Sequence, residues 1–194
     1  MMMSYKLANM EAIEFMRTLE NKSVDACILD LPYGTTSCSW DEIIPFAHMW
    51  EQVDRICKGA FITTASQPFT TKLIMSNEKQ FKYEMIWNKG RGFDPQLANI
   101  RPMKSHENII VFCKGKTIYN PQMIPIKPYT RRNREIVSLN RKDGTGQNIF
   151  SGSKPFAEKE YTQSFPLSVI NSGFERGEHP TQKPVALFEY LIRT

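Results

Sequence analysis

The stretch D-L-P-Y at residues 30–33 brings together groups that can hold a planar heterocycle carrying an exocyclic amine. The Asp30 carboxylate and the backbone carbonyl of Leu31 or Pro32 are hydrogen-bond acceptors, and Tyr33 supplies an aromatic face. Pro32 restricts the backbone, so the acceptors are preorganised at little entropic cost. An ordinary strand-end turn, in which Asp, Pro and Gly are common, is the alternative interpretation.

The elements that must position this stretch follow an α/β pattern, because apolar strands alternate with amphipathic helices. Residues 24–29 are apolar on both faces apart from Asp25, as in a parallel strand covered by helices. Asp41 is expected to cap the helix that follows. Strands are expected at 5–8, 24–29, 60–65, 81–87, 108–113 and 167–170, and helices at 9–20, 42–58, 68–76 and from 184 onward. The fold expected is therefore a doubly wound sheet, in which ligands bind at the carboxyl ends of strands, where Asp30 lies.

A basic segment interrupts this pattern from residue 114 to residue 165, where the periodicity fades and Pro, Gly and polar residues dominate. Residues 113–165 contain ten basic and four acidic side chains, so they carry +6 while the rest of the chain carries −1. A concentrated positive charge indicates a polyanionic partner, although a solvated surface loop would have the same composition. We interpret 114–165 as a recognition insert between residues 1–113, one half of a catalytic domain, and 166–194, the return to it.

Other features narrow the class of protein. The four cysteines form no C-x-x-C pair, and the three histidines lie far apart, so reduced thiols and no metal site are expected. No apolar run approaches the ~20 residues that span a bilayer, and the N-terminus lacks a signal-peptide core. A cytoplasmic protein without membrane association is therefore expected.

Two motifs in this order resemble the β class of DNA amino-methyltransferases, the N6-adenine and N4-cytosine family. D-L-P-Y at 30–33 is close to the D-P-P-Y signature of that family, and H-P-T-Q-K-P at 179–184 matches a hallmark of the β arrangement. K-S-V-D at 22–25 and H-E-N-I-I-V-F at 106–112 are further matches. Leu31 replaces the first proline, but the critical group there is a backbone carbonyl, which leucine also supplies.

The resemblance implies a Rossmann-like methyltransferase fold and the transfer of a methyl group from S-adenosylmethionine to the exocyclic amine of a base flipped out of double-stranded DNA. Two acceptors on the amine protons would draw the nitrogen toward tetrahedral geometry and free its lone pair. An aspartate at the first motif position favours adenine N6 as the target, with cytosine N4 as the alternative. A non-catalytic DNA-binding or partner-binding remnant of such an enzyme is the rival function.

The resemblance also implies roles for individual residues. The catalytic residues would be Asp30, Leu31, Pro32 and Tyr33. The residues expected to bind the cofactor are Asp30, His179, Thr181, Gln182 and Lys183. Five basic residues of the insert are expected to contact DNA phosphates or base edges, namely Arg131, Arg132, Arg134, Arg141 and Lys142.

In the β class a glycine-rich cofactor-binding segment is expected after the H-P-T-Q-K-P helix, and the sequence contains no such segment. We interpret the chain as a truncated methyltransferase, with a split enzyme or self-association as alternatives. Residues 24–29 would then form an exposed apolar edge strand, which a homodimer contact or a complementary polypeptide is expected to cover. The isolated chain is accordingly expected to bind S-adenosylmethionine weakly.

Overall fold

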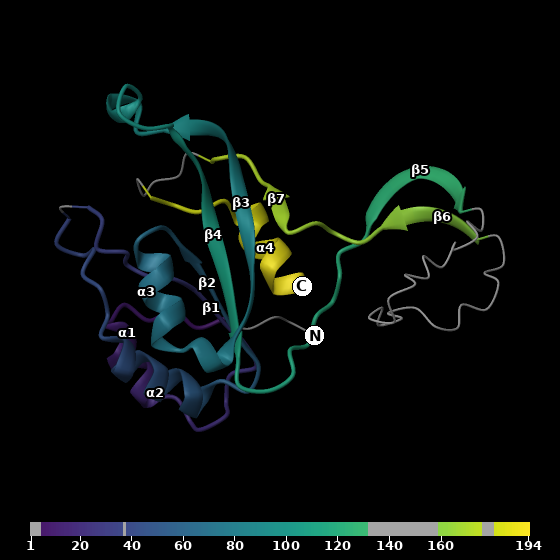
Figure 1. Cartoon of the computed structure of the whole chain (residues 1–194). Coiled ribbons are helices and arrows are strands. Elements are labelled where there is room, and N and C mark those ends of the chain that lie inside the picture. The colour runs from purple at the N-terminus through teal and green to yellow at the C-terminus, as the bar shows by residue number, and fades with distance from the viewer. Residues whose placement is uncertain (1–4, 37, 132–158, 176–180) are drawn as a thin grey trace, which may run out of the picture. The chain divides into compact units, whose positions relative to one another are not determined.

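The computed structural model describes residues 5–36, 38–131, 159–175 and 181–194 (Figure 1). The chain divides into two compact units, of which the larger comprises Met1–Asn120 with Leu167–Thr194 and the smaller comprises Pro121–Pro166. None of the helices in the described ranges is long and apolar enough to cross a membrane.

The larger unit is built on a five-stranded mixed sheet in the order β1-β2-β4-β3-β7. β1 runs parallel to β2 and β3 runs parallel to β7, whereas β4 is antiparallel to both of its neighbours. The strands are β1 (Cys27–Asp30), β2 (Ala60–Ala65), β3 (Phe81–Phe93), β4 (Lys104–Cys113) and β7 (Val169–Asn171). The helices are α1 (Ala12–Thr18), α2 (Phe46–Ile56), α3 (Phe69–Ser76) and α4 (Val185–Arg193), with 3-10 turns at Glu78–Gln80 and Pro95–Leu97.

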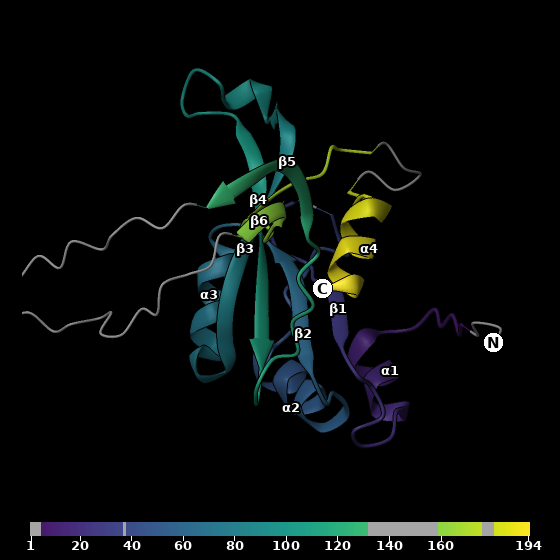
Figure 2. The same cartoon turned by 90° about the vertical axis from the view of Figure 1, so that its right-hand side faces the viewer.

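Helices cover both faces of this sheet, as the Rossmann-like interpretation requires (Figures 1 and 2). Side chains of β4 alternate between two apolar clusters, because successive residues of a strand point to opposite faces. Ile110 and Phe112 pack with α1, α2 and α3, whereas Ile109 and Val111 pack with α4. α4 lies next to β1, the strand at one edge of the sheet (Figure 2).

Several boundaries differ from the sequence prediction. The strand expected at 5–8 is absent from the structure, and Tyr5 and Leu7 are almost fully exposed, because no neighbouring strand pairs with this segment. The helix expected at 9–20 spans only Ala12–Thr18. The helix expected at 42–58 starts at Phe46 after Pro45, so Asp41 does not cap it.

The smaller unit contains an antiparallel pair of strands, β5 (Ile124–Arg131) and β6 (Lys159–Ser164), where the sequence predicts irregular structure. Tyr129 lies opposite Tyr161, and the two rings stack with centroids 5.3 Å apart. The unit begins at Pro121, a few residues after the predicted start of the insert, and its role in target recognition stays a prediction.

Candidate active site

Asp41 holds the turn that follows β1. Its Oδ1 accepts the backbone N–H groups of Tyr33 at 2.7 Å and Gly34 at 2.9 Å. Its Oδ2 accepts the N–H groups of Thr35 at 2.9 Å and Thr36 at 2.7 Å, and the Thr36 hydroxyl at 2.8 Å. Burial would raise the pKa of Asp41, but these hydrogen bonds outweigh it and lower the pKa from 3.8 to about 2. The turn is thus fixed by one ionised carboxylate.

Glycine is required within this turn. Gly34 has φ +65°, in the left-handed region, and a Cβ there would lie 2.8 Å from Cγ1 of Ile43. The backbone of the predicted catalytic motif therefore takes a conformation that both Gly34 and Asp41 favour.

A cavity of about 760 Å³ opens at the carboxyl end of β1. Its wall combines the two motifs that lie farthest apart in the sequence, because Asp30 to Tyr33 and Thr181 to Lys183 all line it. The remaining lining residues come from the 35–41 loop, from β3 and β4 with their connection, and from single positions beyond β2 and β7: Thr35, Thr36, Trp40, Asp41, Gln67, Trp87, Lys89, Phe93, Asp94, Arg101, Lys104, Glu107 and Phe174.

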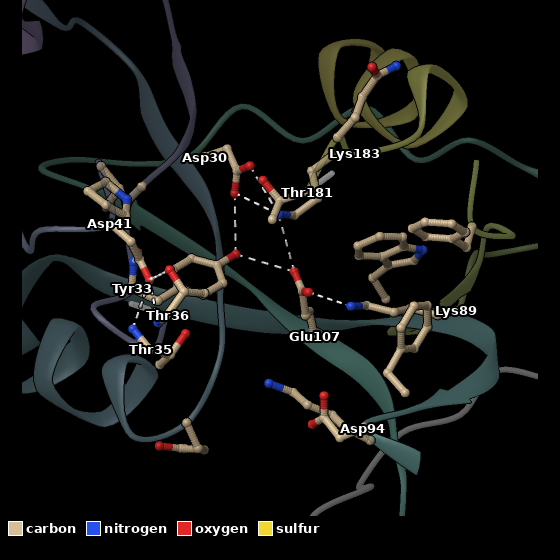
Figure 3. A pocket seen from close by; sticks show the side chains of 18 of the residues that line it. Asp30, Tyr33, Thr35, Thr36, Asp41, Lys89, Asp94, Glu107, Thr181 and Lys183 are labelled. Carbon is tan, nitrogen blue, oxygen red and sulfur yellow. Dashed lines mark hydrogen bonds and ion pairs between the residues drawn. The ribbon is translucent and has the colours of Figure 1, made fainter. Parts of the chain in front are cut away.

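Asp30, the last residue of β1, presents its carboxylate to this cavity (Figure 3). The Thr64 hydroxyl donates to it at 2.5 Å, and the Lys183 ammonium lies 3.0 Å away. The Tyr33 hydroxyl lies 3.3 Å from Oδ1 of Asp30. The side chain of Asp30 is nevertheless 36% exposed, so a ligand in the cavity can reach it.

Glu107 forms a second acidic centre beside Asp30 (Figure 3). Its side chain is 10% exposed and contacts the ammonium groups of Lys89 at 2.5 Å and Lys183 at 3.6 Å. The Tyr33 hydroxyl lies 3.3 Å from Oε2 of Glu107. Burial would raise the pKa of Glu107, but the charges of Lys183 and Lys89 outweigh it, so the pKa is lowered. The result is an alternating series of charges, Lys89–Glu107–Lys183–Asp30.

The Tyr33 hydroxyl connects the two acids and remains a hydrogen-bond donor. Burial and the charges of Glu107 and Asp30 raise the pKa of Tyr33 well above its usual range. The ring stacks on Phe69 with centroids 5.4 Å apart, so one of its faces is already covered. Stacking of a flipped base on Tyr33 stays a prediction.

Aromatic rings line another part of the cavity. Trp87 is fully buried and donates from Nε1 to the carbonyl of Ser172 at 2.6 Å. Phe93 and Phe174 meet edge to face with centroids 5.3 Å apart, and the Lys89 ammonium lies 4.6 Å from the centroid of Phe93. Such a wall can contact a planar ring.

The structure brings together most of the predicted catalytic and cofactor residues, because Asp30 to Tyr33 and Thr181 to Lys183 line one cavity. Leu31 is buried and Pro32 half-buried in the cavity wall. Arg131 ends β5 in the smaller unit. His179, Arg132, Arg134, Arg141 and Lys142 lie outside the described residues.

The sequence prediction does not include several residues of the site, among them Asp41, Lys89 and Glu107. Asp41 was assigned to a helix cap, and Lys89 to no element of the site. Glu107 lies in one of the segments that resemble the family, and a glutamate ahead of the apolar run 109–113 was the available signal.

Comparisons with known proteins agree with these motifs. A family model described as DNA methylase (N6_N4_Mtase) matches residues 24–194. The type II methyltransferase M1.MboII of Moraxella bovis is 26% identical over 97% of this chain and 78% of its own length. The type II methyltransferase M.HpaI of Haemophilus parainfluenzae is 25% identical over 98% of this chain and 59% of its own length. The solved structure of PvuII DNA methyltransferase (cytosine-N4-specific) matches 94% of this chain over 67% of its own, with a TM-score of 0.56. The sequences are 12% identical over this match, so the likeness is one of fold.

Proposed function

The chain belongs to the DNA methylase family, and from this premise we propose that it is a site-specific DNA methyltransferase that modifies the exocyclic amine of a flipped base, with adenine N6 as the expected target. The observation that carries the proposal is the Asp30 carboxylate, which is open to the cavity and is followed by a turn that Asp41 fixes. The second motif, Thr181 to Lys183, lines the same cavity, and the Lys183 ammonium lies 3.0 Å from the Asp30 carboxylate.

Asp30 and the turn after it would act on the amine directly. The Asp30 carboxylate accepts a hydrogen bond from one N–H of the amine and the carbonyl of Leu31 or Pro32 accepts one from the other, which frees the nitrogen lone pair for attack. As the N–C bond forms, the bond between the methyl carbon and the donor sulfur breaks, and its electron pair stays on sulfur. The amine then loses one proton to Asp30, which accepts it as a general base.

The cavity fits S-adenosylmethionine as the methyl donor, because it combines aromatic side chains for a planar ring with buried ammonium groups for a carboxylate. When bound, this cofactor supplies a methyl group that is already activated by a positively charged sulfur. Thr181, Gln182 and Lys183 line the cavity and are the described residues that we expect to hold it, together with Asp30. His179 of the same motif has the same expected role.

DNA would be contacted by the smaller unit. A pair of antiparallel strands can enter the major groove, and its basic side chains can contact phosphates. Lys127 and Tyr129 are exposed on β5, and Tyr129 stacks on Tyr161. We propose the same role for Arg131, Arg132, Arg134, Arg141 and Lys142.

Transfer of labelled methyl groups from S-adenosylmethionine to DNA tests this function. Asp30→Ala is expected to abolish transfer while DNA binding stays within twofold of the wild-type value. Asp25→Ala is the matched control, because Asp25 precedes the same strand but its side chain is 91% exposed on the surface. Wild-type transfer by the Asp30 variant would contradict the catalytic role.

Two further outcomes are distinguished by the same assay. Nucleoside analysis of the labelled DNA separates N6-methyladenine from N4-methylcytosine, and the second product would correct the expected target. DNA binding without any transfer by the wild-type chain would favour a non-catalytic role.

A further inference from the structure

Glu107 is a buried carboxylate that the proposed reaction does not use. It lies on β4, and its two cationic partners come from different parts of the chain, Lys89 from β3 and Lys183 from the segment before α4. Side chains of both lysines are about as buried as Glu107, with exposures of 11% and 9%. Lysine is almost never fully buried unless it is paired, so this arrangement needs the carboxylate between them.

Two of the donors around Glu107, the Lys183 ammonium and the Tyr33 hydroxyl, also lie beside Asp30. Lys183 lies 3.0 Å from the Asp30 carboxylate and 3.6 Å from Glu107, and the Tyr33 hydroxyl is 3.3 Å from each. A hydroxyl has one proton to donate, so Tyr33 can satisfy only one of the two acids at a time. In the structure, therefore, Asp30 and Glu107 compete for the Tyr33 hydroxyl, and they share the Lys183 ammonium, which has three N–H donors.

This competition matters because an incoming amine needs free acceptor positions on Asp30. Thr64 and Lys183 donate to Asp30 in the structure, and the Tyr33 hydroxyl lies within hydrogen-bond distance of it. Displacing buried donors without another acceptor is costly, since each would be left unsatisfied. Glu107 is already within reach of Tyr33 and Lys183, so these two can move to it and leave Asp30 to the amine.

We propose that Glu107 is a positioning residue that receives the Lys183 ammonium and the Tyr33 hydroxyl when the target amine binds Asp30. This inference rests on the proposed function and deepens it, because it assigns to Glu107 the release of the acceptor that the reaction uses. Lys89, 2.5 Å from Glu107, holds the carboxylate in place from the other side.

Glu107→Gln tests the proposal, because glutamine keeps the shape and removes the charge. We expect kcat for methyl transfer to fall about 100-fold, the scale of a misplaced reacting group, while the Kd for DNA stays within twofold. Glu107→Asp keeps the charge and is expected to restore part of kcat. Glu84→Gln is the matched control, because Glu84 is exposed on neighbouring β3.

A second readout does not depend on activity. Lys183 is held from two sides and is expected to be modified slowly by an amine-reactive reagent in the wild-type chain. In Glu107→Gln it should be modified several-fold faster, whereas Lys58, whose side chain is 53% exposed, should be modified at the same rate in both and serves as the internal reference. Mass spectrometry of the peptides measures both rates.

Folding of the variant is controlled separately. If Glu107→Gln unfolds because Lys89 is left unpaired, the charge-balanced double variant Glu107→Gln/Lys89→Gln takes its place and should show the same losses. Unchanged kcat together with unchanged modification of Lys183 would overturn the proposal. If the wild-type chain transfers no methyl group, the proposed function fails, and unchanged modification of Lys183 still overturns the role of Glu107.

Discussion

Replacing Asp41 by asparagine tests whether one carboxylate fixes the turn that carries the proposed catalytic groups. Asparagine keeps one acceptor oxygen, so the bonds to Tyr33 and Gly34 can remain. Two bonds at Oδ2, from the N–H groups of Thr35 and Thr36, are lost to an NH2 group that is itself a donor, whereas the Thr36 hydroxyl can turn and accept from it. At about 1 kcal/mol net for each lost bond, the free energy of unfolding should fall by about 2 kcal/mol.

The pH dependence gives an independent check on Asp41, and its sign follows from the lowered pKa. The folded-state pKa of about 2 is below the ordinary value of 3.8, so the folded chain favours the ionised form. This stabilisation is fully present above pH ~4 and is lost as the pH falls through about 2. The difference in stability between the wild type and Asp41→Asn should therefore narrow between pH 4 and pH 2.

Urea unfolding followed by tryptophan fluorescence measures this difference at each pH. Asp25→Asn is the control, because Asp25 pairs with Lys58 on the surface, and its replacement should cost less than about 1 kcal/mol. The reasoning is refuted if Asp41→Asn costs no more than Asp25→Asn, or if the difference between wild type and Asp41→Asn is the same at pH 7 and pH 2.5.

Two other substitutions test the turn and the smaller unit. Gly34→Ala places a Cβ against Ile43 at φ +65°, so it should destabilise the chain by about 1–2 kcal/mol in the same urea assay, and an unchanged midpoint would show that the turn tolerates a side chain. Arg131→Gln combined with Arg132→Gln should weaken DNA binding and reduce the slope of log K against log salt by about 2 in fluorescence anisotropy. An unchanged slope would show that these side chains do not contact phosphates.

The sequence predicted best those elements that have clear boundaries. Residues 60–65 form β2 as expected, because Gly59 ends the preceding helical pattern and the Phe, Ile and Thr residues that follow favour a strand. The prediction of a strand at 5–8 was wrong, because alternating apolar residues form a buried strand only where another strand pairs with them. β3 continues to Phe93, beyond the expected end, because Gly90 takes φ +71° within a register shift instead of ending the strand.

The two motifs of the site were found from the sequence, but their surroundings were not. Asp30 and Lys183 are 153 positions apart, and only the resemblance to a family joined them before the fold was known. The role of Asp41 depends on the backbone N–H groups that point toward its carboxylate. Those N–H groups are brought there by the folded conformation of the turn, which the sequence alone does not show. The role of Glu107 depends on lysines from two other segments, which no local pattern places beside it.

The balance of charge in the cavity links the position of Lys183 to the reaction. Asp30 and Glu107 together carry −2, and Lys89 and Lys183 carry +2, so the four groups are neutral as a set. Positive charge would develop on the amine nitrogen during methyl transfer, at the point that faces Asp30. While the Lys183 ammonium is closest to Asp30, its charge opposes the positive charge on the amine nitrogen. When Lys183 moves to Glu107, the Asp30 carboxylate can stabilise the charge on the amine nitrogen instead. The same movement that frees an acceptor for the amine therefore also favours the charge of the transition state, which is why a neutral glutamine at position 107 should impair kcat more than DNA binding.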